Sequence, residues 1–150
     1  MRDVSVGSPT QESVMQVLLV EDEPIIAEDT AEMLREAGHE VSGPAATVDE
    51  AVRLAQEGGA DLALVDINLC GQEEGPRLAR ALWALFGVPS LFVTAQPEQA
   101  RQHRDAAVGV LSKPYAAGEL VQSVPMAKAV SDGEEPRSWR PRNLELFRPA

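Results

Sequence analysis

The chain has 150 residues, enough for one domain with a substantial hydrophobic core, and 24 Asp and Glu against 13 Lys and Arg give it a formal net charge of −11. This acidic balance argues against direct binding to nucleic acid and against adhesion to anionic membranes, because both require a basic surface. The single cysteine, Cys70, excludes an intramolecular disulfide, so we expect a reducing, cytoplasmic setting.

Residues 1–14 show no hydrophobic periodicity, and they contain no apolar region typical of a signal peptide or a membrane span. We therefore expect a flexible lead-in, followed by a single domain over residues 15–130.

Short apolar runs typical of buried strands alternate with segments of helical spacing along the rest of the domain. The predicted strands cover residues 17–20, 41–45, 62–66, 90–94 and 108–112. The predicted helices cover residues 25–37, 47–58, 76–86, 97–107 and a last segment from 116 onward. The segment 97–107 has only alanines as apolar residues, so we predict that it is the least stable element. Pro125 is expected to kink or end the last helix.

This strict alternation of five strands and five helices predicts an α/β fold. Strands that are apolar throughout are typical of a parallel sheet buried on both faces. We therefore expect a doubly wound, five-stranded parallel sheet with helices on both sides, connected by right-handed crossovers.

Polar side chains lie at the ends of four of the predicted strands: Glu21 and Asp22, then Asp66, Thr94 and Lys113. In a doubly wound sheet these ends converge on the edge where ligands bind. Three carboxylates in one pocket repel each other and need counter-charge, of which Lys113 supplies one unit. Oxygen ligands without a nearby His or Cys favour Mg²⁺ over zinc as the remaining cation. A carboxylate beside Mg²⁺, an ammonium group and a hydroxyl is suited to accept a phosphoryl group.

Four segments together resemble the receiver domain of two-component response regulators, and the resemblance covers roughly residues 15–130. These segments are Val17–Pro24, Leu62–Leu69, Phe92–Ala95 and Leu111–Tyr115. The resemblance implies a flavodoxin-like sheet with strand order 2-1-3-4-5.

Residues 89–95 resemble the subclass of receivers with a Phe-Ala-Thr-Gly signature, although Val93 and Ala95 replace its Ala and Gly. Val110 stands where many receivers carry an aromatic residue, and Tyr115 is the nearest aromatic side chain.

The resemblance implies that Asp66 accepts a phosphoryl group from the phosphohistidine of a sensor histidine kinase. It further implies that Thr94 and Lys113 hold the phosphoryl oxygens, and that Asn68 and Gln96 occupy positions that tune the lifetime of the phosphate. The implied Mg²⁺ ligands are Asp22, Asp66, the backbone carbonyl of Asn68 and, largely through water, Glu21.

Residues 131–150 are rich in Pro, Arg and Glu, a composition typical of a disordered tail. The same segment contains Trp139, Leu144, Leu146 and Phe147, which are costly to leave in water. Two interpretations stay open: a disordered C-terminal tail, or an arm that docks onto its own domain or onto a second copy.

No DNA-binding or enzymatic module is recognisable after the receiver-like segment, so we predict a single-domain, non-enzymatic receiver that signals through a downstream protein partner. The face made by residues 97–124 is the expected docking surface, and that face or the C-terminal arm is also where a homodimer would form. Ordering or repacking of residues 95–109 is the expected switch.

Two other functions compete with this prediction. One is a receiver-like binding module that signals without phosphate. The other, ranked last, is a small Mg²⁺-dependent phosphatase, which would need a general-acid carboxylate where Asn68 stands. His39 and His103 have no partners at catalytic spacing and are expected at the surface, and Trp83 is expected to pack at the edge of the core.

Overall fold

The computed structural model describes residues 14–147, and residues 1–13 of the predicted lead-in lie outside this part of the chain. Strands and helices alternate through the described residues, as the sequence predicts. The strands are β1 (Gln16–Val20), β2 (Glu40–Ala45), β3 (Leu62–Asp66), β4 (Ser90–Thr94), β5 (Gly109–Ser112) and β6 (Leu144–Leu146). The helices are α2 (Pro24–Glu36), α3 (Val48–Gly58), α4 (Gly75–Phe86), α5 (Pro97–Arg101) and α6 (Ala117–Ser131).

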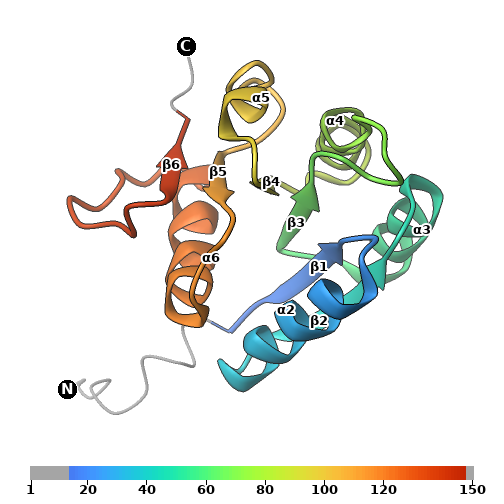
Figure 1. The fold of residues 1–150 in the computed structure, drawn as a ribbon, viewed down its shortest axis with the longest axis horizontal. Coiled ribbons are helices and arrows are strands. Elements are labelled where there is room, and N and C mark those ends of the chain that lie inside the picture. The colour runs from blue at the N-terminus through green and yellow to red at the C-terminus, as the bar shows by residue number, and fades with distance from the viewer. Residues whose placement is uncertain (1–13, 148–150) are drawn as a thin grey trace.

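These strands form one sheet with the order β2-β1-β3-β4-β5-β6 (Figure 1). Strands β1 to β5 are parallel, which confirms the predicted α/β fold and the strand order 2-1-3-4-5. The predicted number of five strands is wrong, because β6 adds an antiparallel strand beside β5. Leu144 and Phe147 are buried there, so the return of the chain to the sheet removes apolar groups from water.

Helices cover both faces of the sheet, and alternate residues of each strand point into two separate cores (Figure 1). The core beneath α3, α4 and α5 includes Val20, Val65 and Phe92. The core beneath α2 and α6 includes Leu19 and Leu64. With both faces buried, polar groups that act on a ligand are confined to the ends of the strands.

Helix α3 begins with side-chain capping at the N-terminus. The hydroxyl of Thr47 accepts a hydrogen bond from the backbone N–H of Glu50 at 3.1 Å, and the Glu50 carboxylate accepts one from the N–H of Ala46 at 2.8 Å. The helix ends at Gly59, whose φ of 71° lies in the left-handed region that favours glycine. Both ends of α3 are therefore fixed by local sequence.

Two predicted helix boundaries differ from the structure. Helix α5 ends at Arg101, because Ala100 is the only residue of the helix that is buried, and such a short apolar face does not support a longer one. Helix α6 continues through Pro125 to Ser131, so the helix does not end at the proline. Val124 and Ala127 are buried on either side of Pro125, and their packing offsets the backbone hydrogen bond that proline cannot make.

The prediction that His39 lies at the surface is wrong. Its side chain is 6% exposed, and its Nδ1 accepts a hydrogen bond from the backbone N–H of Met15 at 3.1 Å. Burial lowers the pKa of His39, which favours the neutral ring that can accept this bond. Trp83, expected at the edge of the core, is 58% exposed and lines a cavity described below.

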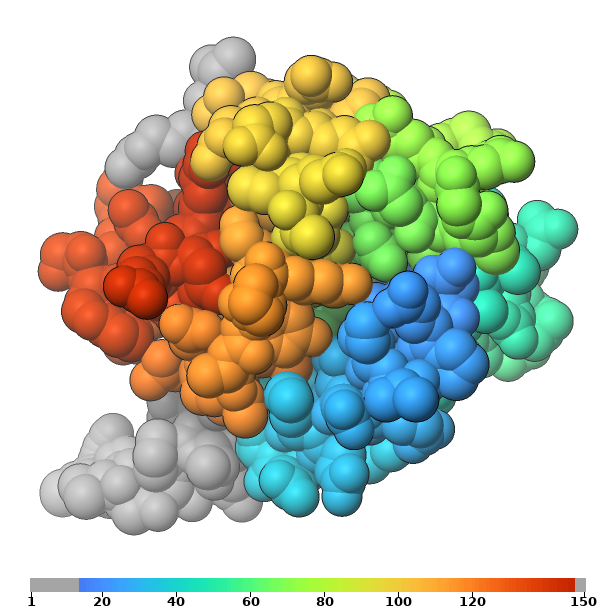
Figure 2. Space-filling model, viewed as in Figure 1, coloured from blue at the N-terminus to red at the C-terminus, as the bar shows by residue number. Residues whose placement is uncertain are grey.

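The C-terminal segment packs against the last parallel strand and α6, as the red and orange surfaces in Figure 2 show. Gly109 lies opposite Leu146 in the register of β5 and β6, and a Cβ atom at position 109 would collide with the carbonyl oxygen of Glu145. Arg101 Nε also donates to Glu145 Oε1 at 2.8 Å, which joins α5 to β6. None of the helices formed by residues 14–147 has the length and apolar composition needed to cross a bilayer.

Candidate functional site

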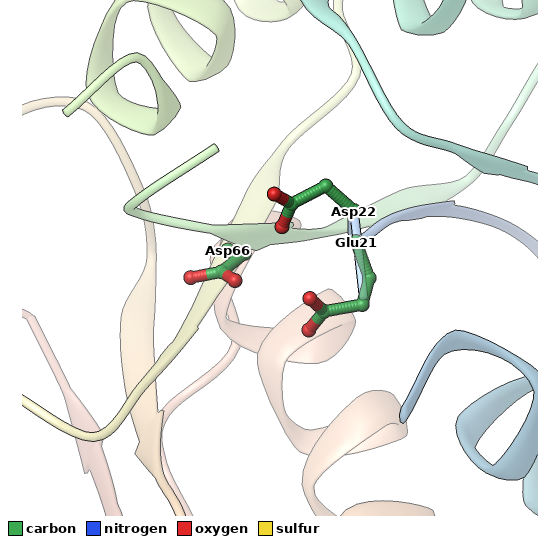
Figure 3. Close-up of side chains that lie close together, drawn as sticks. All are labelled: Glu21, Asp22 and Asp66. Atoms are coloured by element: carbon green, nitrogen blue, oxygen red, sulfur yellow. The ribbon is translucent and has the colours of Figure 1, made fainter. Parts of the chain in front are cut away.

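Three carboxylates meet at the C-terminal edge of the parallel strands. Glu21 and Asp22 directly follow β1, and Asp66 ends the adjacent strand β3. One oxygen atom from each of the three carboxylates lies within 4.8 Å of the others. Figure 3 shows the three side chains facing a common space. The parallel pairing of β1 with β3 thus brings together residues that are more than forty positions apart in sequence.

Lys113, the residue after β5, reaches into this cluster from the other side of the site. Its Nζ donates to Glu21 Oε1 at 3.1 Å and lies 3.7 Å from Asp66 Oδ2. Its backbone N–H donates to the carbonyl oxygen of Thr94 at 2.8 Å, which holds the start of the loop against β4. The peptide bond to Pro114 is cis. The segments that follow β1, β3, β4 and β5 meet near the centre of the face in Figure 2.

The electrostatics of Asp66 reflect its partial burial among charged groups. Desolvation raises the pKa of Asp66 to about 6, and the nearby Glu21 carboxylate contributes in the same direction. Lys113 opposes this rise but does not cancel it. For Lys113 itself, burial lowers the pKa, and the Asp66 and Glu21 carboxylates outweigh that effect, so that the net shift is upward. At neutral pH the site therefore holds an ammonium group beside a mostly ionised Asp66 carboxylate.

Thr94, at the end of β4, and Asn68, in the loop after β3, flank Asp66. Thr94 is the last residue of β4 and is buried, and its hydroxyl accepts a hydrogen bond from the backbone N–H of Gln96 at 3.0 Å. The backbone N–H of Asn68 donates to Asp66 Oδ1 at 3.1 Å and helps to fix the carboxylate. The structure thus places Thr94 and Asn68 on the two strand ends adjoining the acidic cluster.

Two contacts at the site are not evident from the sequence. The amide nitrogen of Asn68 donates to Gln99 Oε1 at 3.1 Å, which ties the loop after β3 to α5. The backbone N–H of Cys70 donates to Asp22 Oδ2 at 2.9 Å. Cys70 has a φ of 53°, and the turn it forms aims its N–H at the acid. Neither contact follows a motif spacing, because both depend on the path of the loop.

The donor set fits a hard divalent cation. Glu21, Asp22 and Asp66 offer only carboxylate oxygens, and no His or Cys side chain belongs to the cluster. Three acids paired with the one ammonium group of Lys113 leave excess negative charge, and a cation would neutralise it. Oxygen-only ligands of this kind suit Mg²⁺ better than zinc.

Comparison with known proteins agrees with this arrangement. Residues 17–125 match the family described as the response regulator receiver domain. The chain is 35% identical over 115 residues to the transcriptional regulatory protein PdtaR of Mycobacterium tuberculosis, covering 75% of this chain and 56% of the relative. It is 40% identical over 85 residues to the phyllosphere-induced regulator PhyR of Methylorubrum extorquens, covering 56% of this chain and 32% of the relative. The chain therefore spans only about a third to a half of these curated relatives.

Solved structures show the same fold. The signal receiver domain of a modulated diguanylate cyclase from Desulfovibrio desulfuricans superposes with a TM-score of 0.71 at 36% identity, covering 81% of this chain and 99% of that one. The response regulator PhyR from Brucella abortus gives a TM-score of 0.71 at 28% identity, covering 80% of this chain and 50% of that one. With acids, Lys and Thr at the strand ends of such a fold, the chain belongs to the response regulator receiver domain family.

Proposed function

We propose that this receiver domain accepts a phosphoryl group on Asp66 from a sensor histidine kinase. One observation carries the proposal: the Asp66 carboxylate lies at the ligand-binding edge of the sheet, between two further carboxylates and the ammonium group of Lys113. Repulsion among these carboxylates destabilises the folded protein, and clusters of this kind are typical of functional sites, where the concentrated charge takes part in binding or chemistry.

The transfer moves one phosphoryl group between two side chains. The P–N bond of the donor phosphohistidine breaks while a P–O bond forms to a carboxylate oxygen of Asp66, and the leaving imidazole nitrogen takes up a proton. Lys113 Nζ, 3.7 Å from Asp66 Oδ2, is placed to stabilise the added negative charge. The Thr94 hydroxyl would turn from the Gln96 N–H toward a phosphoryl oxygen.

Asp22 and Asp66 would hold Mg²⁺ directly, together with the backbone carbonyl of Asn68, and Glu21 would act largely through water. When bound, the ion neutralises charge on the phosphoryl oxygens during transfer. Glu21 has a second task in this chain, because its Oε1 accepts the hydrogen bond from Lys113 and so positions the ammonium group. The acids therefore divide between metal binding and orientation of the lysine.

We propose that the signal leaves through a protein partner docked on the face formed by residues 97–124. The relatives are named for different outputs, among them transcriptional regulation and a diguanylate cyclase. A shared receiver fold therefore does not define the partner, which must recognise surface features of this chain. The link from Asn68 to Gln99 gives a direct contact between the acceptor loop and that face.

The proposal is tested by incubating the full chain with Mg²⁺ and acetyl phosphate and measuring intact mass. We expect the wild type to gain the mass of one phosphoryl group, and Asp66→Asn to gain none. Asp29→Asn, which changes an exposed acid on α2, is the matched control and should be phosphorylated as the wild type is. Omission of Mg²⁺ should suppress the modification.

A wild-type chain that stays folded, binds Mg²⁺ and yet takes up no phosphate from acetyl phosphate or from a phosphorylated histidine kinase would contradict the proposal. That result would favour a receiver-like module that signals without phosphate. Modification that persists in Asp66→Asn would place the acceptor elsewhere in the chain.

A further inference from the structure

A second cavity lies at the end of the sheet opposite Asp66. Its volume is about 520 Å³, within the usual range of sites for small organic ligands. Ser90, which lines it, is the first residue of β4, whereas Thr94 at the candidate phosphorylation site is the last. At the rise of a β-strand, these two ends are about 13 Å apart. The cavity is therefore separate from the acidic cluster.

Four parts of the chain build the walls of this cavity. Trp83 comes from the last turns of α4, Val108 from the loop before β5, Val130 from the end of α6, and Phe147 directly follows β6. Most of the lining is apolar, and the exposed indole of Trp83 stands at the mouth. A ligand held here would contact the C-terminal segment and the body of the domain at once.

The polar group in the depth of the cavity is the hydroxyl of Ser90. Ser90 is 1% exposed, and its Oγ has no hydrogen-bond partner within residues 14–147. Leaving a buried hydroxyl without a partner is unfavourable, so such groups usually have a partner in the protein, an ordered water or a bound molecule. Ser90 is also one of the residues that line the cavity, so this hydroxyl lies beside the space that a ligand would fill.

The positive group at the cavity is Arg104. Its guanidinium carbon lies 5.2 Å from the ring centre of Phe147, and it forms no ion pair with a carboxylate of the described chain. Asp105, a carboxylate that also lines the cavity, is paired with Arg80 at 3.1 Å. On a chain with a net charge of −11, this is a local positive site whose charge is available to an anion.

We propose that this cavity binds a small amphipathic organic anion with a flat apolar body and one carboxylate or sulfonate group. The apolar walls formed by Trp83, Val108 and Phe147 accept the body of the ligand. Arg104 pairs with the acidic group, and Ser90 makes a hydrogen bond in the interior. This site is spatially separate from the candidate phosphorylation site, since it shares no residue with the acidic cluster.

The probe for the test is 8-anilino-1-naphthalenesulfonate, which combines fused aromatic rings with a sulfonate and fluoresces when it leaves water. We expect saturable binding of one probe per chain and a rise in the unfolding temperature as probe is added, because binding to the native state stabilises it. In a Trp139→Phe chain, Trp83 should transfer excitation energy to the probe. In Trp83→Phe that transfer should be lost.

Two variants locate the probe. Ala107→Phe places a ring in the cavity, and we expect it to weaken binding by about tenfold or more because the apolar volume is filled. Ala117→Phe adds the same ring at an exposed position on α6 outside the cavity and should leave binding unchanged. Arg104→Gln should weaken the sulfonate probe, but should leave the uncharged analogue N-phenyl-1-naphthylamine unaffected.

Equal binding to Ala107→Phe and Ala117→Phe chains, both folded by circular dichroism, would overturn the proposal. A second copy of the chain in the cavity would also overturn it. In that case the sedimentation coefficient would rise with protein concentration, and probe binding per chain would fall at the same time. Equal affinity of Arg104→Gln and the wild type for the sulfonate probe would contradict the proposed pairing of Arg104 with the acidic group of the ligand.

Discussion

The raised pKa of Asp66 leads to a test of whether the acidic cluster costs the folded protein stability. In the folded chain the pKa is about 6, against an ordinary value of 3.8, so the folded state binds this proton more tightly than the unfolded state does. Asp66 is therefore neutral in both states well below pH 3.8, whereas above pH 6 its ionised form destabilises the fold. The Asp66→Asn substitution removes this charge at every pH.

The full pKa difference corresponds to at most about 3 kcal/mol at neutral pH. Because the carboxylate lies at the edge of the sheet near solvent, we expect Asp66→Asn to stabilise the metal-free protein by roughly 1–2 kcal/mol at pH 7.5. For a domain of this size that gain raises the unfolding temperature by about 2–8 °C. The stabilisation should shrink steadily between pH 6 and pH 4.

Urea unfolding followed by circular dichroism measures the effect, with Asp29→Asn as the matched control on exposed surface. Addition of Mg²⁺ should stabilise the wild type and Asp29→Asn, but not Asp66→Asn, because only the first two retain the acceptor carboxylate. An Asp66→Asn chain that is less stable than the wild type at pH 7.5, or a difference independent of pH, would refute the reasoning.

Three further predictions follow from other contacts. Lys113→Ala should raise the pKa of Asp66 above about 6, because it removes the nearby ammonium group, and the change can be followed by carboxyl-carbon NMR titration. Gly109→Ala should detach β6, because the added Cβ collides with its backbone, and amide exchange should then rise over residues 144–147 while β1 to β4 keep their protection. Gln99→Ala, which breaks the hydrogen bond to Asn68, should shorten the lifetime of phosphate on Asp66 by about fivefold if the link is worth about 1 kcal/mol, the usual net energy of a hydrogen bond. Intact mass after removal of the donor measures this lifetime, and an unchanged lifetime would show that Asn68 acts without the link.

The parallel part of the fold could be predicted from the sequence because each strand carries a continuous apolar run. Residues 17–20 and 62–65 are buried throughout, and their pairing in β1 and β3 alone decides that Asp22 and Asp66 meet. Strand β6 could not be predicted in the same way. Its three residues, Leu-Glu-Leu, are too short to show a period, and they follow a segment whose composition is typical of disorder.

The site was predictable at the level of strand ends and not at the level of loops. Lys113 could be placed because it directly follows a strand that ends at the same edge of the sheet as β1, and its long side chain spans the distance to Glu21. The bond from Asn68 to Gln99 depends on how two loops are folded, which no residue pattern specifies. His39 was misjudged for a similar reason, since its burial depends on a hydrogen bond from Met15 before the first strand.

The C-terminal segment and the candidate phosphorylation site are joined at one residue. The backbone N–H of Ser112 donates to the carbonyl oxygen of Asn143 at 2.9 Å, and the amide of Asn143 donates back to the Ser112 carbonyl at 3.0 Å. Ser112 directly precedes Lys113, whose own N–H is bonded to Thr94. The Lys113 side chain can turn toward a phosphoryl group by changing rotamer, but a shift of its backbone would have to be accommodated by bending at this double hydrogen bond or by moving the segment that leads to β6. The backbone pairing of β5 with β6 adds to this restraint. The sixth strand therefore restrains the backbone that carries Lys113, in addition to burying apolar residues of the C-terminal segment.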